Sequence, residues 1–335
     1  MAPPIASHPR FKLGRVLMAG SGGGPEEAID VFCALLEEAV ERASRAVGNE
    51  GDGPPGDGLD AALAEYEYGN ALFRAAVRRE EDDGGENADS KKPAADPVED
   101  GGKEAASERS PPSASSGDED LALGLRAMES SLCPVMEYYH GGDGGKEDGG
   151  LRGWARDQIV RAMTSVGDGH SHGGRHGEAA DWYVRARPYA EASWEARRGR
   201  LEGGAATLAV EDLRAQRRLV ELDAVVCEAM LSCPRGEDIA VLDDDEEEED
   251  SEGTTDKTAS TQTRRLICMA GDRLDFAAGH YESARLGMEE LIARYGRMKG
   301  GTGAVEGLDD EGKDIGYAVM LVVGAGNRLE EERSA

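Results

Sequence analysis

The sequence lacks the features that mark several common classes of protein. Aromatic residues make up 5% of the 335 residues, and no apolar run approaches the roughly eighteen residues that a membrane-spanning helix needs. The N-terminal segment MAPPIASHPRFKLGR has no apolar core of the kind found in secretory signals. These absences argue against secretion and membrane insertion, so we expect an intracellular protein with no membrane partner.

Cysteine is scarce and irregularly placed. The five cysteines form no CxxC pair, and each lies in or near an apolar stretch: Cys33, Cys133, Cys227, Cys233 and Cys268. Zinc sites and disulfide frameworks depend on recognisable cysteine spacing, which is missing here. We therefore expect free thiols in a reducing compartment.

Positive charge is also in short supply. The chain has 38 Lys and Arg against 68 Asp and Glu, which gives a formal net charge of −30. Such a protein repels nucleic acid and anionic membranes and attracts basic proteins or cations. Two stretches concentrate the acids: residues 80–120, with fourteen acidic and four basic side chains, and residues 243–252, with nine carboxylates. Both have almost no large apolar side chains, so we expect them to be disordered inserts.

Helical periodicity dominates the rest of the sequence. Apolar residues recur at three- and four-residue steps, as amphipathic helices require, over 26–47, 59–79, 121–140, 153–166, 177–199, 205–233, 263–298 and 312–332. Pro134 should bend or break the third helix, and Gly271 should introduce a turn in the seventh. Gly316, Gly324 and Gly326 weaken the last helix. No alternation of period two is evident, so the predicted fold class is all-α.

These segments predict five consecutive regions. They are N-terminal repeat helices over 11–79, a disordered acidic insert over 80–120, central repeats over 121–235, a second acidic insert over 236–262, and C-terminal repeat helices with a capping helix over 263–332. Three of the helices share a small–aromatic–small pattern, in which Ala179, Tyr183 and Ala186 are matched by Ala278, Tyr281 and Ala284 and by Ala28, Phe32 and Leu35. Helix–turn–helix units of this style are typical of tetratricopeptide repeats, so we expect a helical solenoid interrupted by the inserts.

The motifs also have a characteristic order. AEYEYGNALFRAAVRREEDD runs into the first acidic stretch, and EDLALGLRAMESS follows that stretch. ARDQIVRAMTSV, EAADWYVRARPYAEASW, RRLVELDAVVCEAM and HYESARLGMEELI come next. In this order, over roughly residues 11–330, the chain resembles the nuclear autoantigenic sperm protein family of histone chaperones, with its SHNi-type tetratricopeptide repeats. It departs from that pattern in the expanded segment GDGHSHGGRHG and in the second acidic insert.

The resemblance implies a nuclear histone chaperone with a cytoplasmic pool. It implies binding of core histones, H-three and H-four in preference, and shielding of these histones before nucleosome assembly. No catalytic activity and no cofactor or metal are expected, and a homodimer remains open. The expected partner-binding residues lie in the repeats and in the second insert: Tyr66, Tyr68, Asn70, Glu221, Glu228, Asp243, Asp244, Asp245, Glu246, Glu247, Glu248, Glu249 and Asp250.

Other interpretations stay open. The acidic stretches are also consistent with solubilising linkers, the two tyrosines with packing residues, and the two glutamates with a solvated helix face. A generic tetratricopeptide interaction scaffold is the first alternative function. A metal-dependent enzyme is the second, since His170, His172 and His176 are the one group with metal-ligand side chains at short spacing.

Overall fold

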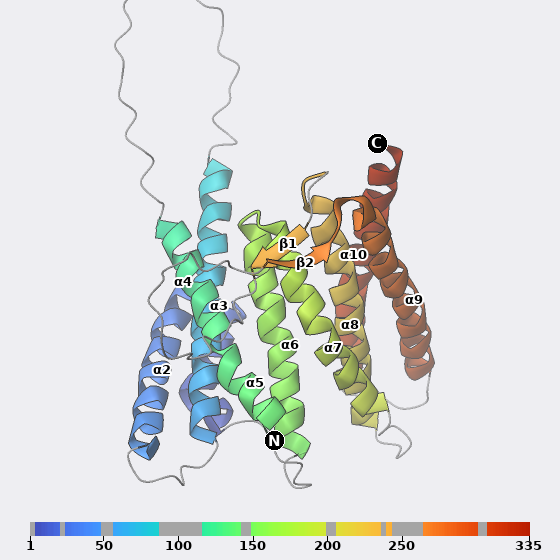
Figure 1. Ribbon diagram of the computed structural model, residues 1–335. Helices are drawn as coiled ribbons and strands as arrows, with labels where there is room; N and C mark the ends of the chain where they lie inside the picture. The colour runs from blue at the N-terminus through green and yellow to red at the C-terminus, as the bar shows by residue number, and fades with distance from the viewer. Residues whose placement is uncertain are drawn as a thin grey trace, which may run out of the picture. The chain divides into compact units, whose positions relative to one another are not determined.

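The computed structural model of the chain describes residues 4–20, 24–47, 56–86, 116–141, 149–198, 206–235, 239–242, 264–300 and 307–335. Helices dominate this part of the chain, which confirms the predicted all-α class, with two short strands as the exception. The chain divides into two compact units, residues 1–152 and residues 153–335 (Figure 1).

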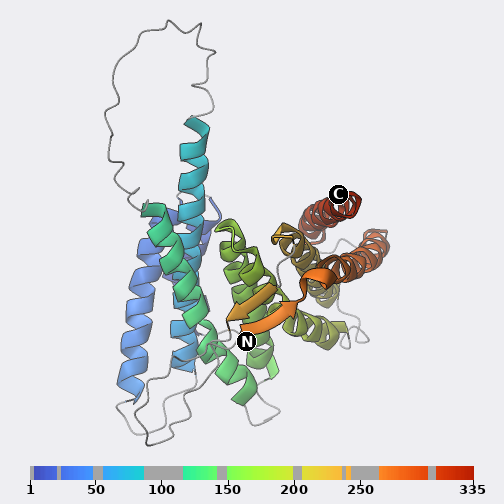
Figure 2. The same cartoon turned by 45° about the horizontal axis from the view of Figure 1, so that its top comes forward.

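The first unit is a series of helices that pack on their neighbours in sequence. Its elements are η1 (Pro4–Ser7), α1 (Pro9–Met18), α2 (Pro25–Val47), α3 (Gly56–Glu86), α4 (Ser116–Ser130) and α5 (Leu132–Gly141). Helix α1 packs on α2, α2 on α3, and α3 on α4, and the last three helices run side by side in Figures 1 and 2. This order of packing places the outer side of α2 in solvent.

Aromatic packing and one buried carboxylate hold the start of this unit together. The rings of Phe11 and Phe32 meet edge to face, with centroids 5.7 Å apart. Asp60 on α3 is 1% exposed, and it accepts a hydrogen bond of 2.9 Å from the backbone N–H of Ile5. Its other oxygen lies 3.3 Å from the guanidinium of Arg42 on α2. Because a buried carboxylate is costly without partners, these contacts tie η1 and α2 to α3.

The first acidic insert is shorter than predicted. Helix α3 continues to Glu86, and α4 begins at Ser116, so five acids of the 80–120 stretch lie at the end of α3 and three near the start of α4. The remaining part of the predicted insert, residues 87–115, falls outside the described residues. The predicted 121–140 helix is divided at Ser131, and Pro134 lies in the first turn of α5, where its missing N–H costs no helical hydrogen bond.

The second unit is built mainly around α8. Its elements are α6 (Gly149–His172, within which the division falls), α7 (His176–Arg198), α8 (Ala206–Ser232), β1 (Ile239–Leu242), β2 (Arg264–Cys268), η3 (Ala270–Asp272), α9 (Arg273–Lys299) and α10 (Leu308–Ser334). Helix α8 packs on α7, α9 and α10, and α9 also packs on α10. The apolar core that joins α8, α9 and α10 includes Leu213, Val220, Met288, Leu291, Ile315 and Val322.

The prediction of helix over residues 263–298, with a turn at Gly271, is wrong for the residues before that turn. Residues 264–268 form β2, which pairs antiparallel with β1, and Leu266 lies opposite Ala240 (Figure 2). β1 falls within the predicted second insert, and Ile239 in it is 5% exposed. Two short β-branched and apolar segments, IAVL and RRLIC, pair across the acidic stretch, and each is too short to show a period of its own. Gly271 lies in η3, ahead of α9.

The histidine-rich segment is mostly helical, so α6 extends well beyond residue 166, where the sequence predicted that this helix ends. Helix α6 runs to His172, and it ends with the N–H of Gly174 bonded to the carbonyl of Ser171 and the N–H of Arg175 bonded to that of His170. These two bonds form a Schellman motif, which requires a left-handed residue. Gly174 supplies it with a φ of 72°.

Glycines do not interrupt the last helix, although the sequence suggested a weak one. Helix α10 is continuous over Leu308–Ser334. A Cβ at Gly312 would lie 2.3 Å from the hydroxyl of Tyr295, and a Cβ at Gly326 would lie 2.8 Å from the ring of Tyr281. The two tyrosines of α9 therefore pack directly on the backbone of α10, and the glycines make room for them.

Candidate protein-interaction surfaces

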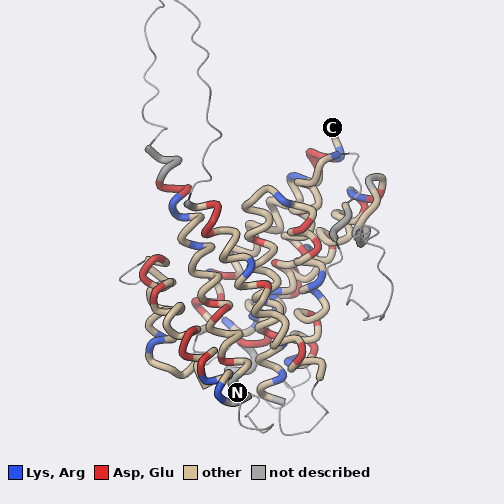
Figure 3. The backbone as a smooth tube through the Cα atoms, turned by 60° about the vertical axis from the view of Figure 1, so that its left-hand side comes forward, with Lys and Arg blue, Asp and Glu red and all other residues tan. Residues whose placement is uncertain are grey.

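An acidic ridge runs along the solvent side of α2. The buried face of this helix carries Ala28, Phe32, Leu35 and Ala39. The opposite side exposes Glu27, Asp30, Glu37 and Glu38, which follow one another at steps of three, seven and one residues. We call these four residues the α2 ridge. Figure 3 shows the distribution of acidic and basic residues over the helices.

The ridge is electrostatically uncompensated. Within the described residues no ion pair involves any of its four carboxylates, whereas the neighbouring Glu41 is paired with Arg45 at 2.5 Å. Like charges three or four residues apart destabilise a helix by about 0.2–0.5 kcal/mol per pair. A ligand with several positive charges would relieve this repulsion as it bound.

A second group of carboxylates lies where α3 ends and α4 begins. Glu81 and Asp82 are exposed at the end of α3, and Asp118 and Glu119 are exposed at the start of α4. The acids at the start of α4 stabilise that helix, because they lie at the positive end of its dipole. The acids at the end of α3 destabilise that helix, because they lie at the negative end of its dipole. Asp120, beside them, is paired with Arg79 on α3. This end of the first unit therefore attracts cations, as the acidic composition of 80–120 suggested.

The tyrosine-rich motif is largely buried. Tyr66 is 1% exposed and Asn70 is 5% exposed, so a partner cannot reach either side chain on the surface of this fold. Tyr68 is half-buried, and burial raises the pKa of its hydroxyl, with further contributions from Cys33 and Asp120. Of the three predicted contacts in this motif, Tyr68 is the one that the structure leaves accessible. Tyr66 and Asn70 are packing residues, because neighbouring helices cover the faces of α3 that carry them.

Glycines bring two of the recognised motifs together. A Cβ at Gly69 would lie 2.6 Å from the carbonyl oxygen of Gly124, and a Cβ at Gly124 would lie 2.8 Å from that of Gly69. The backbones of α3 and α4 therefore touch at this crossing, which a larger residue on either side would separate. Gly69 belongs to AEYEYGNALF and Gly124 to EDLALGLRAMESS, so these two motifs form one helix–helix contact.

The predicted glutamates of α8 have partners within the second unit. Glu221 accepts a hydrogen bond of 2.7 Å from Arg217, and Glu228 accepts one of 2.7 Å from Arg328. Burial raises the pKa of Glu221, while Arg217 opposes that effect. Their side chains are 22% and 28% exposed. A basic ligand would have to displace these arginines, so Glu221 and Glu228 should bind such a ligand more weakly than the α2 ridge does.

The carboxylates predicted in the second insert, Asp243 to Asp250, lie outside the described residues. The four residues of the α2 ridge were not predicted as contacts. Their helical spacing on the polar side of an amphipathic pattern is the signal that could have identified them.

The histidines of the metal-enzyme alternative do not converge. His170 and His172 lie in the last turn of α6, two residues apart, so they do not share a helix face. His170 is buried and His172 is exposed, while His176 begins α7. Throughout the part of the chain that the structure describes, no group of three or more His, Cys, Asp or Glu is placed to hold a metal ion.

Comparisons with known proteins gave no match, whether with family models, curated proteins or solved structures. A search of the described helices for one long and apolar enough to cross a membrane found none.

Proposed function

We propose that this chain is a histone chaperone of the tetratricopeptide-repeat type, which binds core histones and shields them before nucleosome assembly. Histones H-three and H-four are the preferred partners, and the protein acts in the nucleus with a cytoplasmic pool. No catalytic step is involved. The α2 ridge is the observation that carries the proposal, since it offers exposed carboxylates without cation partners to a strongly basic protein.

The net charge of −30 supports a basic partner over DNA or RNA. Charge alone gives attraction at a distance and a fast encounter, and it is screened beyond about 8 Å at physiological ionic strength. A fixed array of carboxylates on one helix adds a defined spacing of negative charges to that attraction. The ridge therefore favours a partner with basic residues at matching intervals, as an amphipathic basic helix has.

A repeat solenoid is supported by the order of packing. In both units helices contact their neighbours in sequence, as repeat proteins do. The aromatic residue of each predicted repeat faces a glycine on an adjacent helix: Phe32 faces Gly14, Tyr183 faces Gly167, and Tyr281 faces Gly326. A structural unit that is repeated along the chain would produce a recurring contact of this kind between an aromatic ring and a glycine.

The resemblance to the nuclear autoantigenic sperm protein family gains support from the α3–α4 crossing. The motifs that carry the resemblance include Gly69 and Gly124, and these two glycines meet in space. Their conjunction explains why the tyrosine-rich helix and the helix after the insert need glycine at these places.

The test compares the full chain with two variants of equal charge. The ridge variant combines Glu27→Gln, Asp30→Asn, Glu37→Gln and Glu38→Gln. The control variant combines Asp309→Asn, Glu290→Gln, Glu330→Gln and Glu331→Gln, which are exposed positions on α9 and α10. Affinity for purified H-three/H-four is measured by fluorescence titration at several salt concentrations.

The ridge variant should bind H-three/H-four at least about tenfold more weakly, because several charge contacts are lost together. The control variant should bind nearly as well as the unchanged chain. If both variants lose the same affinity, net charge and not the ridge controls binding. If neither variant loses affinity, the α2 ridge does not contact the histones.

A further inference from the structure

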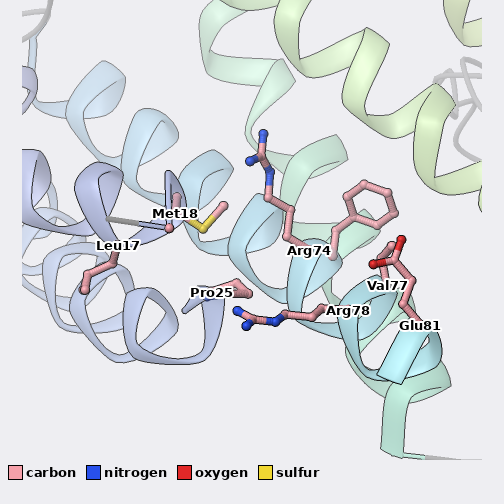
Figure 4. Close-up of a pocket in the computed structure, with 9 residues that line it drawn as sticks. Leu17, Met18, Pro25, Arg74, Val77, Arg78 and Glu81 are labelled. Carbon is pink, nitrogen blue, oxygen red and sulfur yellow. The ribbon is translucent and has the colours of Figure 1, made fainter. Parts of the chain in front are cut away.

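A groove in the first unit has the opposite charge character to the α2 ridge. It encloses about 350 Å³ between the end of α1, the start of α2 and the second half of α3. Leu17 and Met18 line it from α1, and Val77, Arg74 and Arg78 line it from α3 (Figure 4). Phe73 of α3 also lines it. The volume is at the lower end of the range for ligand-binding cavities.

The two arginines have no carboxylate partner. Both are exposed, and neither takes part in an ion pair within the described residues. By contrast, Arg79, next to Arg78 in sequence, is paired with Asp120. In a chain with 68 acidic and 38 basic residues, two arginines one helical turn apart that form no ion pair with the described carboxylates are a local exception. Arginine binds carboxylates in a two-pronged geometry, so such a pair suits an acidic ligand.

The start of α2 brings both signs of charge to the groove, because Glu26 and Glu27 lie in the first turn of α2 and a Cβ at Gly24 would meet the Glu26 carboxylate at 2.7 Å and the Arg78 guanidinium at 3.1 Å. Pro25 is the first residue of α2 and lines the groove, and Figure 4 shows the Arg78 side chain reaching toward it. The N-terminus of a helix carries a partial positive charge. Glu81 lies at the other edge and repels carboxylates there. An anionic group is therefore best placed beside Arg74 and Arg78.

The apolar walls favour a ligand that has apolar side chains as well as negative charge. Leu17, Met18, Phe73 and Val77 are only partly buried by the fold. On α1 the apolar surface continues through Leu13, which is 50% exposed and lies one turn before Leu17. A free phosphate or a bare polyanion would leave these walls uncovered. A peptide with large apolar side chains between acidic ones would cover them and reach both arginines.

We propose that this groove binds an acidic segment of a partner protein, with an apolar side chain inserted between α1 and α3 and its carboxylates on Arg74 and Arg78. The groove is formed by different residues from those of the α2 ridge. It binds an acidic partner, whereas the ridge binds a basic one. The two surfaces would let one chain hold a basic and an acidic protein together.

The probe is a fluorescein-labelled peptide of sequence Glu-Glu-Leu-Glu-Glu-Phe-Glu-Glu, titrated with the full chain and followed by fluorescence anisotropy. A peptide with glycine in place of leucine and phenylalanine tests the apolar walls, and one with lysine in place of glutamate tests the charge. The test variant is Arg74→Glu with Arg78→Glu. The matched control is Arg10→Glu with Arg126→Glu, which changes two exposed arginines on α1 and α4.

The acidic–apolar peptide should bind the unchanged chain and the control variant. It should bind the Arg74/Arg78 variant at least about tenfold more weakly, since charge-assisted hydrogen bonds are lost. The glycine and lysine peptides should both bind worse than the probe. Circular dichroism establishes that each variant is folded, and unchanged H-three/H-four affinity of the Arg74/Arg78 variant separates this site from the ridge.

Equal binding by both variants, or no binding of the probe by the unchanged chain, would overturn the proposal. Equal binding of the glycine peptide would reduce the site to a surface that attracts anions and would also overturn it. Self-association that the Arg74/Arg78 variant abolishes would place a second copy of the chain in the groove instead.

Discussion

At the scale of single residues, glycines determine how closely these helices approach. Gly167 is an example: a Cβ there would lie 2.4 Å from the ring of Tyr183 on α7. The ring therefore occupies the space of a side chain on α6, and its hydroxyl donates a hydrogen bond of 2.7 Å to Asp168. Burial raises the pKa of Tyr183, and the negative charge of Asp168 adds to that effect. The hydroxyl thus remains a neutral donor.

Gly174 permits a direct test at this scale. Replacing it with alanine places a Cβ on a residue with φ of 72°, which costs about 1 kcal/mol. Gly173 is adjacent, has no positive φ and meets nothing closer than 3.5 Å. Urea unfolding should show that Gly174→Ala lowers the free energy of unfolding and that Gly173→Ala does not. Equal effects at the two positions would contradict the Schellman ending of α6.

Sequence pattern could not separate these roles of glycine. The segment GDGHSHGGRHG contains five glycines, of which Gly167 is buried against a ring and Gly174 alone has a positive φ. The same limit applies to Tyr66, because periodicity assigns a residue to a helix face but does not say which neighbouring helix covers that face. By contrast, Ala28, Phe32 and Leu35, which the small–aromatic–small pattern identified, are all buried.

At the scale of elements, two buried ionic groups join the helices of the second unit. Arg273 begins α9, and its guanidinium donates to the carbonyls of Leu231 at 3.2 Å and Cys233 at 2.8 Å. It also binds Glu332 on α10 at 2.9 Å. The last carbonyls of a helix lack partners within it. Arg273 therefore caps α8 and links it to both following helices.

Loss of this cap should destabilise the second unit. Arg273 is 5% exposed, and Arg273→Leu leaves several carbonyls without their donor and leaves Glu332 with Arg235 alone, so we expect a loss of about 2–3 kcal/mol in the free energy of unfolding. Arg285→Leu on the same helix removes exposed pairs with Glu282 and Glu289, and it should leave stability nearly unchanged. Thermal and urea unfolding measure both. A small effect of Arg273→Leu would show that the cap is replaceable by water.

Asp223 on α8 is the centre of the other group. It accepts hydrogen bonds from Arg187 on α7 at 2.8 Å and from Ser283 on α9 at 2.6 Å, and His280 Nδ1 lies 2.7 Å away. Burial acts to raise the pKa of Asp223, but the hydrogen bonds from His280, Arg187 and Ser283 and the charge of Arg187 outweigh it, so its pKa lies below the ordinary 3.8.

A lowered carboxyl pKa stabilises the fold above the ordinary value, and this stabilisation is lost as the pH falls through the pKa of the folded state. Asp223→Asn should therefore cost about 1–3 kcal/mol at pH 7 and progressively less as the pH falls below 3.8. Asp309→Asn, at an exposed position, is the control. Urea unfolding across this pH range measures the difference. A cost that does not change with pH would contradict the assigned role of the charge.

The elements differ in how far sequence could predict them. Long amphipathic helices such as α2 and α8 were located to within a residue or two, because many apolar positions repeat at one period. Strand β2 was missed because five residues show too little periodicity, and its partner lies across a long acidic stretch. The end of α3 was missed because its last turns are acidic and carry no apolar stripe.

At the scale of the whole molecule, acidic charge is placed on folded surfaces as well as in the acidic stretches of the sequence. Composition predicted a basic partner, and the contacts were expected at Tyr66, Tyr68, Asn70, Glu221, Glu228 and the 243–250 tract. The structure instead offers the α2 ridge as an exposed and uncompensated surface. Their spacing on the polar side of an amphipathic pattern marks such acids as candidates, and the helix arrangement then identifies which of them remain uncovered.

The central claim is that this chain selects histones H-three and H-four. The most direct test is isothermal titration of the full chain with purified H-three/H-four and with H-two-A/H-two-B, each at low and physiological salt. We expect tighter binding of H-three/H-four, and this preference should persist at physiological salt, where unspecific charge attraction is screened. Equal affinity for both histone pairs, or for polylysine of similar charge, would contradict it.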